Sequence, residues 1–148
     1  MIIFGGYAGH QRLNDLHCFN FTTSKWSLLS NYLAPPPRDR HSAVIYENKF
    51  VVFGGFDGVT RVDDLHYFDL DLQMWKTIVE YNGTPPTARH SHSAVIWKQS
   101  LFIFGGYDGS YRNDFYEFNF STKTWHQVSF ITLRSCLSNM SLTPCSTL

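Results

Sequence analysis

The side chains best suited to chemistry in this chain of 148 residues are arginines and aromatic rings in three loops, each of which follows a Gly-Gly pair. Arginine and aromatic side chains dominate protein-binding hot spots, because both bury a large area and arginine can hold a carboxylate with two hydrogen bonds. We therefore interpret these loops as a surface that binds another protein. The alternative is that each arginine only pairs with a nearby aspartate such as Asp63 or Asp64. The candidate residues are Tyr7, Arg12, Phe56, Asp57, Arg61, Tyr107, Asp108, Tyr111 and Arg112.

Two further arginines, Arg38 and Arg89, each stand three residues before a histidine, His41 or His92. The equal spacing favours a structural role, in which the guanidinium bonds to a carboxylate or a carbonyl of a neighbouring unit. Binding of a partner stays open as the other interpretation, and both arginines belong to the candidate set.

Residues that could bind a metal or catalyse a reaction do not combine into a site. His17 and His66 share one position in a repeated pattern, and the third copy has Tyr116 there, so packing explains them better than metal binding. His90 and His92 could lie on one strand face, but no cysteine or carboxylate follows at ligand spacing. No Ser-His-Asp set or phosphate loop stands out. We expect no catalytic residue, no metal and no cofactor.

The elements that must position the candidate residues occur three times. A Gly-Gly pair, an aspartate and a tryptophan follow one another in each copy, with 11 positions from aspartate to tryptophan and 49 or 50 between successive tryptophans. A repeat of about 50 residues is typical of propeller blades with four strands. The signature residues are Gly5, Gly6, Asp15 and Trp26, then Gly54, Gly55, Asp64 and Trp75, then Gly105, Gly106, Asp114 and Trp125.

The second copy is complete, and its turn residues divide it into four short β-branched or aromatic segments. We expect strands at 41–46, 50–53, 65–69 and 74–79, the second of which ends at Gly54-Gly55. That strand is apolar throughout, which predicts that both of its faces are covered. Asx residues at Asn20, Asp69 and Asn119 predict the turn before each fourth strand. The tryptophan that follows should pack where this outer strand meets the next blade.

Composition limits the classes of partner. Twelve basic residues balance twelve acidic ones, and the basic residues are scattered, so the footprint of a nucleic-acid binder is missing. No apolar run approaches the ~20 residues of a membrane span, and the N-terminus lacks the features of a signal peptide. Three cysteines without a CxxC motif favour a reducing compartment. We expect a cytoplasmic or nuclear protein that binds another protein, but neither nucleic acid nor membrane.

The order Gly-Gly, variable loop, Asn/Asp-Asp-Leu/Phe, Phe-Asn/Asp and Trp resembles the kelch repeat over residues 1 to about 130. The Pro-Pro…Arg-x-x-His-Ser-Ala connections at 35–43 and 85–94 look like the long-loop kelch subgroup. The resemblance implies an all-β, partial kelch propeller of about three four-stranded blades, and a protein-interaction scaffold. It further suggests the substrate-recognition part of a ubiquitin-ligase adaptor. The alternatives are a fragment of a galactose-oxidase-like propeller enzyme and a structural or cytoskeletal kelch protein.

The repeat pattern divides the chain at three boundaries. Residues 1–30 are a partial blade that lacks its innermost strand, 31–81 and 82–130 are full blades, and 131–148 form a divergent tail that we expect to be disordered. The tail is either a genuine end or the product of a truncated gene. Propellers use about four to eight blades, so we expect the chain to belong to a larger propeller or to self-associate.

Overall fold

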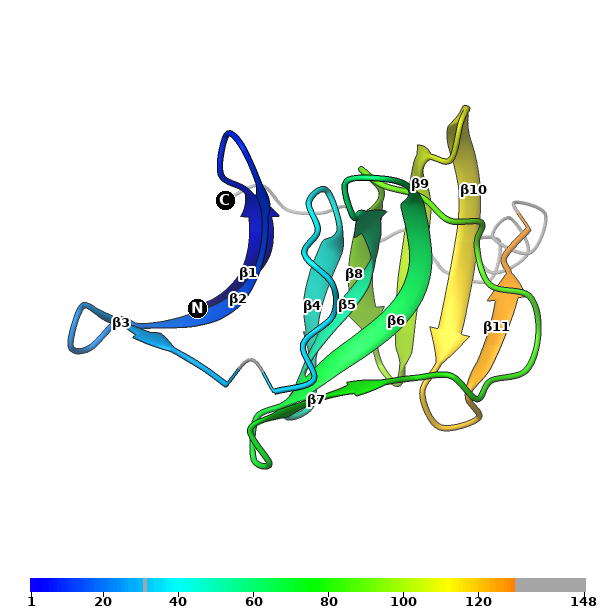
Figure 1. Cartoon of the computed structure of the whole chain (residues 1–148). Coiled ribbons are helices and arrows are strands. Elements are labelled where there is room, and N and C mark those ends of the chain that lie inside the picture. Colours follow the sequence, from blue (N-terminus) through cyan, green and yellow to red (C-terminus); the bar gives the residue numbers. More distant parts are fainter. Residues whose placement is uncertain (31, 130–148) are drawn as a thin grey trace, which may run out of the picture.

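A computed structural model describes residues 1–30 and 32–129, and the predicted tail at 131–148 lies outside them. The described residues form eleven strands in three antiparallel sheets and no helix, which confirms a partial propeller (Figure 1). Each sheet is one blade whose strands pair in chain order. Blade 1 contains β1 (Ile2–Tyr7), β2 (Arg12–Asn20) and β3 (Lys25–Leu28); blade 2 contains β4 (Ser42–Tyr46), β5 (Lys49–Phe56), β6 (Arg61–Asp69) and β7 (Met74–Thr77); blade 3 contains β8 (Ser93–Trp97), β9 (Ser100–Tyr107), β10 (Tyr111–Asn119) and β11 (Thr124–Gln127).

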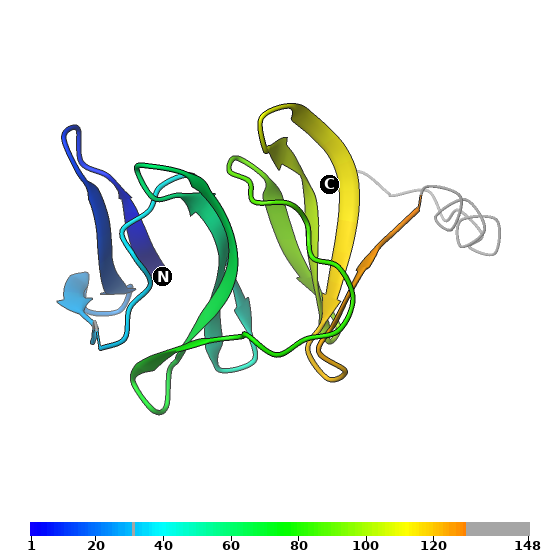
Figure 2. The same ribbon diagram turned by 45° about the vertical axis from the view of Figure 1, so that its right-hand side comes forward.

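Every connection within a blade is a short turn, so successive strands run in opposite directions. As a result, the three loops that follow the Gly-Gly pairs lie at the same end of the three sheets (Figures 1 and 2). We call this the loop end, and define it by residues 7–12, 56–61 and 107–111. The opposite end, or turn end, carries the turns at 46–49, 69–74 and 119–124. The predicted Asx turns are confirmed there, because Asn20, Asp69 and Asn119 each accept two backbone N–H bonds.

The Gly-Gly pair does not end the second strand as predicted. β5 continues to Phe56 and pairs with β6 on both sides of a register shift between Phe53 and Gly55. Gly55 has a φ of +106°, and a Cβ atom there would lie 2.8 Å from the Asp39 carbonyl oxygen. The pair therefore forms a bulge, which bends the strand and lets the incoming 38–41 segment approach its backbone.

The core consists of two apolar clusters, one at each junction between neighbouring blades. Because side chains alternate along a strand, Phe50 and Val52 of β5 join the cluster with blade 1, and Val51 and Phe53 join the one with blade 3. All four are buried, which confirms that both faces of this strand are covered.

The tryptophans pack in the direction opposite to the one predicted. Trp75 of blade 2 lies 4.8 Å from the ring of Phe4 in blade 1, and Trp125 of blade 3 lies 5.5 Å from Phe53 in blade 2. Each tryptophan thus contacts the preceding blade rather than the next one. The alternation of the outer strand sets this direction, which the repeat pattern alone does not reveal.

Candidate functional site

The loop end carries one continuous row of rings and arginines across all three blades. Arg12 lies over the Tyr7 ring at 5.2 Å and over the Phe56 ring of the next blade at 4.6 Å. Farther along, the Tyr107 ring lies 5.3 Å from that of Tyr111 and takes Arg61 of blade 2 on its face at 5.6 Å. We call this set, together with His90, the aromatic row.

His90 closes the gap between blades 2 and 3 in this row. Its ring lies 6.2 Å from Phe56 and stacks on Tyr107 at 5.4 Å. Burial and the positive field of Arg40 and Arg61 lower the pKa of His90, so its neutral form is favoured. From the sequence, His90 was weighed only as a possible metal ligand, and its place in this row was not predicted. The missed signal is its repeat position, directly after Arg89, which corresponds to that of Asp39 after Arg38.

Asp39 was also missed, and it anchors Arg12 in the row. The Nε atom of Arg12 donates to Asp39 Oδ1 at 2.8 Å, and the Asp39 carboxylate is nearly buried. Asp39 also pairs by its backbone with Phe56. Because the Arg12 side chain is four-fifths buried, the bond and the two rings hold it in place. The alternative interpretation, that each arginine pairs with a nearby aspartate, therefore holds for Arg12. Its partner is Asp39 and not Asp63 or Asp64.

Arg112, which lies in β10 directly after the third loop, is paired within its own blade. Its Nε atom donates to Asp108 Oδ2 at 2.8 Å, and Thr87 donates its hydroxyl to the same oxygen at 2.6 Å. These bonds, that of Thr87 first, lower the pKa of Asp108 to about 2. Asp57 has a local role, since it accepts the backbone N–H groups of Val59 and Thr60 and shapes the loop.

The outward side of the row is open to solvent. Tyr111 is 93% exposed and Val59, at the tip of the blade 2 loop, is 91% exposed. Tyr7 is also exposed, and Arg40 beside Asp39 leaves more than half of its side chain in solvent. The row therefore offers ring faces and cationic groups on a supported backbone, a surface suited to apolar and carboxylate groups of a partner.

Arg38 and Arg89 lie apart from this surface. Their guanidinium groups bond to a carboxylate and a carbonyl, as predicted, but within their own blade rather than in a neighbouring unit. Both are fully buried. Arg38 donates to both carboxylate oxygens of Asp64 and to the Gly54 carbonyl, and Arg89 does the same to Asp114 and Gly105. Burial alone would raise the pKa of Asp64, but the bonds from Arg38 and His66 outweigh it and hold that pKa far below its usual range.

His66 and His17 act with the repeat aspartates. His66 bonds Asp64 at 2.7 Å and Thr77 at 2.9 Å, and His17 bonds Asp15 at 2.7 Å. Within residues 1–30 and 32–129, no group of three or more His, Cys, Asp or Glu side chains is arranged to hold a metal ion. That part of the chain also contains no helix with the length and hydropathy of a membrane span.

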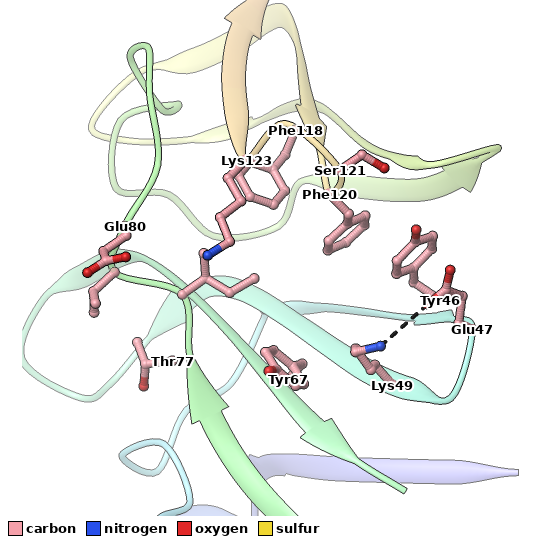
Figure 3. A pocket seen from close by; sticks show the side chains of 12 residues that line it. Tyr46, Glu47, Lys49, Tyr67, Thr77, Glu80, Phe118, Phe120, Ser121 and Lys123 are labelled. Carbon is pink, nitrogen blue, oxygen red and sulfur yellow. Dashed lines mark hydrogen bonds and ion pairs between the residues drawn. The ribbon is translucent and has the colours of Figure 1, made fainter.

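A hollow of about 370 Å³ lies at the turn end, between blades 2 and 3 (Figure 3). Tyr46 of blade 2 and Phe120 of blade 3 stack there, with ring centres 4.1 Å apart. Its rim carries charges of both signs, with Lys49 near Glu47 at 3.4 Å and Lys123 and Glu80 on the other side. The stacked pair marks this hollow as part of the junction between the blades, so the loop end remains the stronger candidate for recognition.

Comparison with known proteins agrees with this architecture. The family model of the KLHDC2/KLHL20/DRC7 Kelch-repeats domain matches residues 1–141. A relative from Drosophila melanogaster named "Leucine-zipper-like transcriptional regulator 1 homolog" is 31% identical over 138 residues. The match covers 87% of this chain but only 14% of that relative. With three successive blades and a family model that matches nearly its whole length, the chain belongs to the kelch-repeat family.

Proposed function

We propose that the chain recognises another protein through the aromatic row at its loop end. Kelch-repeat domains generally serve protein interaction, and the family and the regulator-named relative favour a binding domain over an enzyme. The observation that carries the proposal is the continuity of the row: Tyr7, Arg12, Phe56, His90, Tyr107 and Tyr111 contact one another in sequence across three blades.

The chemistry of the row defines the kind of segment it binds. Ring faces pack against apolar or aromatic side chains, and guanidinium groups donate hydrogen bonds to carboxylates. Arg61 contributes a cation that lies on Tyr107, and Arg40 contributes one that is 57% exposed. The partner segment therefore combines an aromatic or aliphatic residue with one or more acidic residues. In the context of a longer protein, such a surface would serve as the substrate-recognition part of a ubiquitin-ligase adaptor.

A displayed peptide library tests the proposal. The wild-type chain should enrich peptides that combine acidic and apolar residues, and both Arg61→Ala and Tyr111→Ala should weaken their binding about tenfold or more, as truncated hot-spot residues do. The matched controls lie at the turn end: Lys123→Ala removes a cation and Leu72→Ala removes an exposed apolar side chain. Enriched peptides that bind the loop-end and turn-end variants equally would overturn the assignment to the aromatic row.

A further inference from the structure

The two junctions inside this chain are built from one repeated contact. At the first, Phe4 of blade 1 packs on Trp75 of blade 2, and at the second, Phe53 of blade 2 packs on Trp125 of blade 3. Both tryptophans are fully buried by these contacts. Each junction thus joins the second-strand phenylalanine of one blade to the tryptophan of the following blade.

The same contact is open at both ends of the described chain. Phe104 holds the phenylalanine position in blade 3 and is 47% exposed. Trp26 holds the tryptophan position in blade 1 and is 49% exposed. One end therefore presents the first half of the junction, and the other end presents the second half.

The surroundings of these two residues repeat the junction as well. Phe102 and Phe115 pack beside Phe104 on the open face of blade 3, at the positions that Val51 and Leu65 occupy in the core between blades 2 and 3. On the open face of blade 1, Ile3 corresponds to the buried Val52 and is 47% exposed. An exposed apolar face of this kind marks an interaction site.

A second contact of the internal junctions is open in the same way. Arg12 of blade 1 lies over Phe56 of blade 2, and Arg61 of blade 2 lies over Tyr107 of blade 3. The third arginine, Arg112, is 46% exposed in its side chain, and the ring at the matching position of blade 1, Tyr7, is exposed. Arg12 lies over the Phe56 ring while it also bonds the Asp39 carboxylate. Arg112 could likewise lie over a Tyr7 ring while it keeps its bond to Asp108.

We propose that two copies of this chain join head to tail, with the open face of blade 3 in each copy packed against the open face of blade 1 in the other. A single copy cannot join its own two faces, because blade 2 stands between them. A head-to-tail interface closes into a ring when the rotation allows it. Two copies of three blades supply six blades, which lies within the range of about four to eight in propellers. The partner at this surface is thus a second copy of the chain.

Sedimentation velocity of the full chain with two single variants tests this arrangement. Phe104→Asp should disable one face and Trp26→Asp the other, so each variant alone should be monomeric where the wild type is dimeric. An equimolar mixture should recover dimers, because each copy keeps the face that the other has lost. The recovered dimer has one junction instead of two, and its dissociation constant should be at least about thirtyfold that of the wild type. The control Val59→Asp makes the same apolar-to-acidic change at an exposed loop tip and should leave the dimer intact.

A second test introduces opposite charges at Arg112 and Tyr7. Both side chains are exposed, so these substitutions should leave the fold of each copy intact. Arg112→Glu should weaken the dimer, and the double variant that adds Tyr7→Lys should restore it by placing opposite charges across the junction. A wild-type chain that sediments as a monomer, a variant mixture that stays monomeric, or a series growing beyond two copies would each overturn the proposal. Tyr7 belongs to the aromatic row, whereas Phe104 and Trp26 lie outside it. The mixture of the Phe104 and Trp26 variants therefore tests the dimer independently of peptide binding at the loop end.

Discussion

The guanidinium of Arg38 grips the carboxylate of Asp64 with two parallel hydrogen bonds, at 2.5 and 2.8 Å, and no part of the arginine is exposed. A third bond, from Arg38 to the Gly54 carbonyl, ties it to β5. The pair thus fastens the segment that enters blade 2 to the second and third strands of that blade. Arg89 and Asp114 repeat the arrangement in blade 3.

Removal of the carboxylate should be costly because the arginine would stay buried without a counter-charge. We expect Asp64→Ala to lower the free energy of unfolding by about 3 kcal/mol. Urea unfolding followed by tryptophan fluorescence would measure the loss. The exposed turn aspartate Asp71 is the matched control, and its alanine variant should change stability by less than about 0.5 kcal/mol. Equal small losses in the two variants would refute a structural role for the pair.

Alanine substitutions at two equivalent glycines would distinguish the cost of backbone strain from the cost of steric clash. Gly6 and Gly55 share one repeat position and have nearly the same φ, +102° and +106°. A Cβ atom at Gly6 meets nothing within 4 Å, whereas one at Gly55 would lie 2.8 Å from the Asp39 carbonyl oxygen. Alanine should therefore cost about 1 kcal/mol at Gly6 from strain alone, and about 3 kcal/mol at Gly55 where crowding adds to it.

Chemical denaturation of the two alanine variants and the wild type would give both differences in one experiment. The informative quantity is the difference between the variants, because the strain of a positive φ is common to them. If Gly6→Ala and Gly55→Ala were equally stable, close approach of the 38–41 segment would not be the reason for the second glycine.

The sequence predicted the blades because each blade is specified locally. Strand order and Asx turns depend on residues a few positions apart, and the three copies of Gly-Gly, Asp and Trp fixed the period. The extent of β5 was wrong because Gly54 and Gly55 signal a strand end as readily as the bulge that they form.

The site was less predictable because its contacts join separate blades. Arg12 of blade 1 lies over Phe56 of blade 2, and the place of His90 between Phe56 and Tyr107 depends on how two blades face each other. Even within blade 2, the pairing of Arg38 with Asp64 spans 26 positions. The direction in which Trp75 packs follows from strand alternation within the folded sheet. Pattern analysis could identify the residue types at these positions, but not their partners.

Two histidines, His92 which is buried and His41 which is largely buried, should make the fold sensitive to mild acid. Burial, followed by the field of a nearby arginine, lowers the pKa values of His41 and His92 to about 4 from 6.5. Between those pH values the unfolded chain binds more protons than the folded one, so stability is complete above pH 6.5 and falls as the pH is lowered towards 4. The loss should be on the order of 3 kcal/mol for each histidine.

The free energy of unfolding in urea, measured at several pH values across this window and at constant ionic strength, would show the loss. His92→Gln should reduce the slope of stability against pH, because it removes one of the two groups. The depressed pKa of Asp64 contributes only at lower pH, since an aspartate in the unfolded chain stays ionised above about 4. A flat profile between pH 6.5 and 4 would contradict the neutral state of the two imidazoles.

Trp75 and Trp26 occupy the same repeat position in different surroundings, so their alanine variants should behave differently. Trp75 is 1% exposed against Phe4, and its loss should cost about 3 to 5 kcal/mol by leaving a cavity. Trp26 is half-exposed, so Trp26→Ala should cost less than about 1 kcal/mol in the monomer. If a second copy covers Trp26, the gap between wild type and Trp26→Ala should widen as protein concentration rises, because association stabilises the folded state by mass action. Thermal melts over a hundredfold range of concentration would show this widening, while the deficit of Trp75→Ala should already be present in the most dilute sample. A deficit for Trp26→Ala that is large at every concentration would instead place this tryptophan in the core of its own blade.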